Sequence, residues 1–141
     1  MTTNVKLMVV LSKLNYTFMN RLGKNLENLG MPASTYPILA HLNEVKRAKT
    51  QKLGEVALIT SGTITHMVNK LVQQGYVVKV QDQRDKRVFW VEITAHGRDV
   101  FNQVNGEHLM YLEDLLSEFT KEEKKAFIKQ LKYFGKKIEQ H

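Results

Sequence analysis

Two β-prone runs separated by a charged loop constrain the fold of this sequence more than any other feature. The first run is YVVKV at 76–80, and the second, VFWV at 88–91, follows the loop DQRDKR at 82–87. Such runs on either side of a short polar segment predict a β-hairpin. The cations of the loop are Arg84, Lys86 and Arg87. A solvated turn requires polar residues but not three cations, so the hairpin tip is a candidate binding element.

Helical periodicity dominates the rest of the chain. Apolar residues at steps of three and four run from Leu7 to Leu29, and the stop signal Gly-Met-Pro follows directly. Residues able to cap a helix open each later helix, and Thr120 with Glu123 forms a capping box before the last one. The other expected caps are Ser34, Thr50, Ser61 and Thr94. The expected helices span 7–29, 34–45, 50–57, 61–75, 94–116 and 120 onward.

The predicted fold is mainly α with a small β-hairpin, in the order α-α-α-α-β-β-α-α, within a single chain of 141 residues. Short helices joined by a tight turn and followed by a hairpin form a winged helix-turn-helix, expected over residues 34–93. The flanking helical region comprises residues 1–30 and 94–141. Neither terminal helix has enough partners in one chain to bury its apolar stripe, so both are predicted to form a dimer interface. The predicted dimerisation residues are Leu7, Leu11, Leu14, Phe18, Phe127, Leu131, Phe134 and Ile138.

Positive charge is concentrated in the central third of the chain. Residues 46–87 contain nine Lys or Arg and three Asp or Glu, and nine minus three is +6 of the formal net charge of +7. This concentration favours a polyanionic partner, with a merely solvated basic surface as the alternative. The sequence contains no Cys, which excludes disulfides and thiol switches. It also shows neither a bilayer-length apolar run nor a signal-peptide cleavage pattern, so we expect a cytoplasmic protein with no membrane partner.

The expected fourth helix is a candidate for contact with DNA. Its apolar residues share one face, and the opposite face is small and polar near the N-terminus. A helix in the major groove reads bases from that end, where backbone N–H groups also favour phosphate. The candidate residues are Ser61, Gly62, Thr63, Thr65, His66, Asn69 and Lys70. Taken alone this pattern fits a polar surface helix equally well, but a basic hairpin directly after it favours a winged helix whose tip reaches the minor groove.

The segment LGEVALITSGTITHMVNKLVQQGYVVKVQDQRDKRVFWVEITAHGR, residues 53–98, resembles the core of the MarR family of bacterial transcription regulators. The family pattern is an Asp, an Asp-x-Arg element, a strand that ends in Leu/Ile-Thr, and a Gly a few residues on. The matching residues are Asp82, Asp85, Arg87, Ile93, Thr94 and Gly97. The resemblance extends over the whole chain. It implies a homodimer joined by its terminal helices, regulation by small ligands or oxidants, and a wing in which Arg87 enters the groove while Arg84 and Lys86 contact phosphate.

The acidic residues of the loop suggest that the wing is ordered before it binds. In an extended strand, residues 85 and 87 point the same way. The Asp85 carboxylate can therefore hold the Arg87 guanidinium, which avoids about 0.5–1.5 kcal/mol of ordering cost on binding.

The leading hypothesis is a dimeric, sequence-specific DNA-binding transcriptional regulator, acting as a repressor that a small-molecule effector releases. Dimer symmetry predicts a pseudo-palindromic operator in double-stranded DNA. The rival is a winged-helix module that binds protein or RNA without an operator. An enzyme is not expected, because the sequence shows no acid/base pair, phosphate loop or nucleophile, and we expect no metal or cofactor. Trp90, which shares strand parity with Glu92, is expected to pack in the scaffold or to line a ligand cleft.

Overall fold

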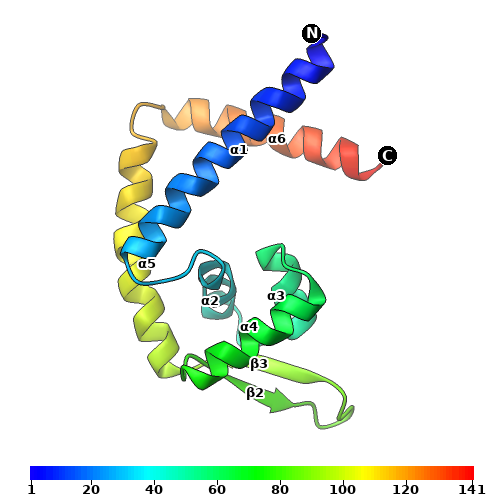
Figure 1. Cartoon of the computed structure of the whole chain (residues 1–141), viewed down its shortest axis with the longest axis vertical. Helices are drawn as coiled ribbons and strands as arrows, with labels where there is room; N and C mark the ends of the chain where they lie inside the picture. Colours follow the sequence, from blue (N-terminus) through cyan, green and yellow to red (C-terminus); the bar gives the residue numbers. More distant parts are fainter. The chain divides into compact units, whose positions relative to one another are not determined.

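The computed structural model describes residues 1–141 and contains six α-helices and one three-stranded antiparallel sheet. Figure 1 shows the helices and the hairpin of β2 and β3. The elements are α1 Thr3–Asn28, α2 Thr35–Glu44, β1 Ala48–Lys49, α3 Thr50–Ala57, α4 Ser61–Gln73, β2 Val77–Gln81, β3 Phe89–Ile93, α5 Ala95–Leu115 and α6 Lys121–Glu139. The chain divides into two compact units, residues 1–108 and 109–141. None of its helices combines the length and the apolar character that crossing a bilayer requires. The mainly helical winged-helix architecture confirms the predicted fold class.

The hydrophobic core of the first unit is built from α2, α3, α4 and the sheet. Its largest fully buried side chains are Ile38, Leu39, Leu42, Leu53, Ile64, Val68, Val77 and Val91. Leu26 of α1 and Phe101 of α5 extend this core. Ile64, Val68 and Leu71 recur at steps of three and four along α4 and are buried, so the opposite face of α4 is left in solvent. The core thereby determines which face of α4 can meet a partner.

The sheet contains a strand that the sequence pattern did not predict. β1 has two residues and pairs antiparallel with β3, so the strand order is β1-β3-β2. Ala48 lies opposite Val91, and Lys49 lies opposite Trp90. The predicted element order omitted this strand, because two residues are too short to show the alternation of a strand. β1 forms only where the folded chain presents the edge of β3.

Two of the predicted helix N-caps are wrong by one residue, and a third is in the predicted place but makes no side-chain capping hydrogen bond. The N-cap of α4 is Thr60 rather than Ser61, and the N-cap of α3 is Lys49 rather than Thr50. Both true caps have extended backbone, and for Lys49 the pairing of β1 imposes it. Ser34 is the N-cap of α2 but has α-helical backbone, and its side chain makes no capping hydrogen bond. The capping box of Thr120 is present at the start of α6, as predicted.

Thr94 and Gly97 join the end of α4 to the start of α5. The Thr94 hydroxyl accepts the Gly97 N–H at 2.9 Å and donates to the Gly75 carbonyl at 2.6 Å. A Cβ added at Gly97 would lie 2.1 Å from the Tyr76 carbonyl oxygen, so only glycine fits there. These contacts explain the Thr and Gly positions of the motif. They hold the base of the hairpin against α5.

The terminal helices leave most of their apolar residues in solvent. The predicted dimerisation residues are exposed except for Phe18, which is half-buried. α1 buries only Leu26, and α6 buries no residue at all.

Candidate nucleic-acid interface

The outer face of α4 is free of bulky and acidic side chains at its N-terminal end. All seven residues predicted for DNA contact on this helix are exposed, and its first turn contains no acid. The Thr60 hydroxyl donates to the Thr63 hydroxyl at 3.1 Å instead of capping the helix. The first N–H groups of α4 therefore keep their capacity to bind an anion. Nothing lies within 4 Å of a Cβ added at Gly62, so that glycine leaves open space on the surface.

Asn69 links α4 to the hairpin. Its side-chain oxygen accepts a hydrogen bond from Lys79 Nζ on β2 at 2.7 Å. This contact uses the acceptor of the amide and leaves its N–H groups as donors for a base or phosphate. Lys79 did not appear among the predicted site residues, since its contact with Asn69 depends on the packing of β2 beside α4.

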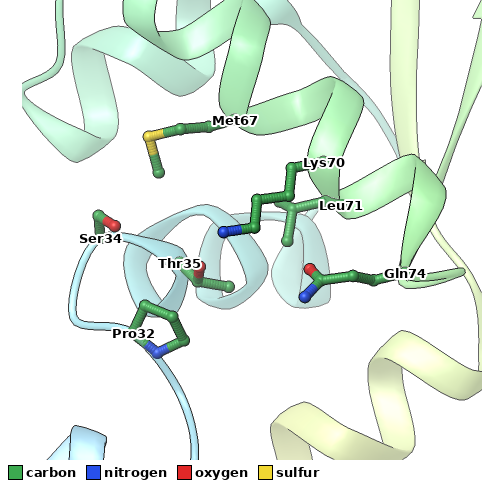
Figure 2. A pocket seen from close by; sticks show the side chains of 7 residues that line it. All are labelled: Pro32, Ser34, Thr35, Met67, Lys70, Leu71 and Gln74. Carbon is green, nitrogen blue, oxygen red and sulfur yellow. The ribbon is translucent and has the colours of Figure 1, made fainter.

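Lys70 lies at the edge of the predicted face. It lines a cavity of about 100 Å³ between α2 and α4, and Figure 2 shows its side chain directed from α4 toward α2. The other lining residues are Pro32, Ser34, Thr35, Met67, Leu71 and Gln74. Lys70 is exposed like Gly62 and His66, but it lies on the side of α4 that faces α2.

Asp82 shapes the tip of the hairpin. One carboxylate oxygen, Oδ2, accepts the backbone N–H groups of Arg84 and Asp85 at 3.0 and 2.9 Å. The other oxygen, Oδ1, accepts from Trp90 Nε1 at 3.0 Å. These bonds, the one from Trp90 most of all, hold the pKa of Asp82 below its usual value. The carboxylate is therefore charged at neutral pH and organises the loop from within.

The contact predicted between Asp85 and Arg87 is present. Arg87 Nε donates to Asp85 Oδ1 at 3.1 Å, and Arg87 Nη2 donates to Oδ2 at 3.2 Å. The guanidinium next to Asp85 lowers the pKa of that carboxyl. The Arg87 side chain remains 91% exposed, so it is oriented without being buried.

The backbone that forms this pair differs from the prediction. Residues 85–88 form a turn closed by a hydrogen bond from the Val88 N–H to the Asp85 carbonyl at 3.0 Å, and the strand begins only at Phe89. Asp85 Oδ1 also accepts the Arg87 N–H at 3.0 Å, as in an Asx turn. The side chains therefore meet across a tight turn and not along an extended strand. Arg84 precedes Asp85, Lys86 lies between the two members of the pair, and both cations are exposed.

Trp90 is half-buried on the outer face of the sheet, with Arg47 and Lys49 over its ring. Scaffold packing was one of the two predicted roles, and these contacts correspond to it. Sequence reasoning counted Arg47 and Lys49 within the basic segment but did not place them near the wing. No local signal locates them there, because the register of β1 on β3 brings them together.

A helix-turn-helix with a polar exposed helix and an ordered basic hairpin defines a winged-helix DNA-binding protein. Residues 32–89 match the model of the MarR family. The HTH-type transcriptional regulator MhqR of Bacillus subtilis (strain 168) is 26% identical over 132 residues, which cover 94% of this chain and 91% of MhqR. The winged region of this chain is therefore similar to that of the MarR family, and the protein is a DNA-binding transcriptional regulator.

Solved structures share the fold. AbsC, a MarR family transcriptional regulator from Streptomyces coelicolor, superposes with a TM-score of 0.87 at 18% identity and covers 100% of this chain and 98% of its own. A mutant of MarR from E. coli, complexed with operator DNA, superposes with a TM-score of 0.78 at 23% identity, covering 95% of this chain and 94% of that one. At these identities the likeness is one of fold.

Proposed function

We propose that this protein is a cytoplasmic homodimeric repressor that binds a pseudo-palindromic operator in double-stranded DNA. In each protomer α4 enters the major groove and the wing enters the adjacent minor groove. The observation that carries the proposal is the wing itself, in which two carboxylates order a loop that carries three exposed cations, on a hairpin that follows a polar helix. A surface that only kept the protein soluble would not require this internal order.

The residues take distinct roles in this proposal. Arg87 enters the minor groove, where a narrow A·T-rich segment attracts a guanidinium. Arg84 and Lys86 bind phosphates on either side, and the open N-terminus of α4 binds another phosphate. His66 and the Asn69 amide lie on the exposed face of α4 and supply donors to base edges.

The dimer is proposed from the uncovered apolar stripes of the terminal helices. α6 exposes an apolar side chain at each step of three or four from Phe127 to Ile138. Such a stripe is typical of a helix that packs against another helix. Two copies related by a two-fold axis would place their α4 helices in half-sites about one DNA turn apart, roughly 10 bp.

A small-molecule effector is proposed to act by binding one dimer shape better than the other. The cavity between α2 and α4, at about 100 Å³, is smaller than the roughly 300–1,000 Å³ of sites for drug-sized ligands. We therefore do not assign it as the effector site.

Selection of bound fragments from random duplex DNA tests the proposal directly. We expect enrichment of two inverted half-sites spaced by about one helical turn. Recovery of fragments without a shared half-site would contradict operator recognition.

Salt dependence separates this function from a protein-binding winged helix. Each phosphate contact contributes a slope of about −0.9 to log K against log salt. Replacing both Arg84 and Lys86 by Ala removes four contacts from a dimer, so the slope should become shallower by roughly 3 to 4. Lys132→Ala on α6 serves as the control, because it removes a cation that lies outside the proposed DNA-binding surface. An unchanged slope in the wing variant would favour the rival module.

A further inference from the structure

We infer that Trp90 is a positioning residue that holds the wing in its DNA-binding shape before DNA arrives. The inference rests on the proposed operator binding and concerns how the wing is ordered. Trp90 is the single Trp of the chain and lies in β3, outside the loop that carries the three cations.

The first step is the hydrogen bond from the indole to Asp82. Trp90 Nε1 donates to Asp82 Oδ1 at 3.0 Å, which leaves Oδ2 to accept the N–H groups of Arg84 and Asp85. One carboxylate thus uses one oxygen to attach to the sheet and the other to shape the loop. Without the indole N–H, the Asp82 side chain gains rotational freedom, and both loop N–H groups lose an acceptor at a defined position.

Two cations, Arg47 and Lys49, lie over the indole ring of Trp90. The Arg47 guanidinium carbon lies 4.3 Å from the Trp90 ring centroid, and Lys49 Nζ lies 5.3 Å from it, both within cation–π range. Lys49 is the direct cross-strand neighbour of Trp90. Both cations are exposed, so they fix the indole and add positive charge beside the wing at the same time.

A chain of hydrogen bonds connects the Trp90 indole to Arg87, the side chain proposed to enter the minor groove. Asp85, whose N–H is held by Asp82, accepts hydrogen bonds from Arg87 Nε and Nη2. The contacts therefore run without a break from Trp90 through Asp82 and Asp85 to Arg87. Because the Trp90 ring is covered by Arg47 and its N–H is already engaged, it acts through Asp82 and not by touching DNA.

The test is Trp90→Phe, which keeps an aromatic face under Arg47 and removes only the donor and one ring. We expect operator affinity to fall about three- to tenfold, the effect of one lost hydrogen bond, with an unchanged salt slope because no cation is lost. In the free protein, amide hydrogen exchange of Arg84 and Asp85 should accelerate, while the unfolding midpoint stays near that of the parent. Val80→Ala, opposite Trp90 on β2, is the packing control and should leave these two amides as they are.

A second variant shows whether Trp90 acts through Asp82. In an Asp82→Ala background, Trp90→Phe should weaken operator binding no further, because its effect has already been removed. If the losses of affinity from Asp82→Ala and Trp90→Phe are additive, the assignment is wrong. It is also wrong if Trp90→Phe alone leaves both the operator affinity and the exchange rates of the loop amides within twofold of the parent. If Trp90→Phe lowers the unfolding midpoint, Asp82→Asn provides the same test without changing an apolar contact. Amide hydrogen exchange of Arg84 and Asp85 at the rate of the parent in Asp82→Asn would then overturn the inference. Absence of operator binding by the parent itself would instead reject the proposed function.

Discussion

The winged helix-turn-helix buries a core of apolar residues, whereas the terminal helices leave most of theirs exposed to solvent. All of the largest fully buried side chains lie between Ile38 and Val91, inside the winged region. α1 buries one residue near its C-terminal end and α6 buries none, although both carry regular apolar stripes. The first region is complete within one chain, whereas the second presents a surface that one chain does not cover.

This difference indicates which region determines the fold of a protomer and which region is available for dimerisation. Each buried apolar side chain of the winged region contributes about 1.5–3 kcal/mol, and this stabilises the orientation of α4 and the wing within a single protomer. The stripes of α1 and α6 contribute comparably only when another surface covers them. We therefore expect mutations in the two regions to separate folding and DNA reading from assembly.

The largest effect is expected from Leu131→Glu on α6. A carboxylate in the proposed interface would cost about 3 kcal/mol or more, which weakens dimerisation by more than about 100-fold and abolishes operator binding. Sedimentation velocity measures the oligomeric state, and circular dichroism checks that helices remain. Gln130→Glu adds the same charge next to the stripe and should stay like the parent. A folded dimer of Leu131→Glu would show that the interface is misplaced.

Gly97→Ala tests the winged region by itself. The added Cβ would meet the Tyr76 carbonyl oxygen at 2.1 Å, so the backbone must move, at a cost of about 2–3 kcal/mol in the free energy of unfolding. Gly106 lies on the same helix with nothing within 4 Å of an added Cβ. Gly106→Ala should therefore stabilise by about 0.5–1 kcal/mol. Urea unfolding of both variants measures the contrast, and equal stabilities would refute the close approach.

The wing pair is tested by operator affinity at one fixed salt concentration. Arg87→Ala should weaken binding by about 1–2 kcal/mol, and Asp85→Ala by about 0.5–1.5 kcal/mol although it makes the protein more positive. The double variant should lose less than the sum, because both act through one contact. Gln83→Ala, an uncharged change in the same loop, is the control. Tighter binding by Asp85→Ala would show that the wing acts by charge alone.

A smaller effect is expected at Leu58, in the turn between α3 and α4. Leu58 has left-handed backbone, with φ 57° and ψ 44°, and its side chain is 94% exposed. Leu58→Gly relieves the strain of a Cβ in that conformation and should raise the free energy of unfolding by about 0.5–1 kcal/mol. Leu58→Ala keeps the Cβ and should change little. Equal stability of the Gly and Ala variants would mean that the turn is unstrained.

The smallest effect is a pH dependence that arises from His108 of α5, which contacts Asn25 of α1. His108 is buried, with Nδ1 2.8 Å from Asn25 Oδ1 and the Tyr36 ring 4.9 Å away, and this burial lowers the pKa of its imidazole. In the unfolded chain the imidazole takes up a proton as the pH falls through its ordinary pKa of about 6.5, whereas in the folded chain it does so only at a lower pH. The free energy of unfolding should thus decrease as the pH falls below that value. His108→Gln should flatten this dependence in urea unfolding between pH 7 and 5, and an identical slope would exclude His108 as its source.

The sequence by itself determined the features that depend on neighbouring residues. Helical periodicity located α1 and α6, and Thr120 with Glu123 marked the start of the last helix because a capping box spans only four residues. The contact between Asp85 and Arg87 was predictable for the same reason, although a turn and not a strand brings the two together. Local patterns carry this information because their energetics are decided within one or two turns of chain.

Tertiary structure alone decided the contacts between distant segments. The two residues of β1 become a strand only on the edge of β3, and this register places Arg47 and Lys49 over Trp90. The hydrogen bond between Lys79 and Asn69 likewise depends on how β2 packs beside α4. These pairings could not be read from spacing, because a shift of one residue in strand register would turn the same side chains to the other face of the sheet.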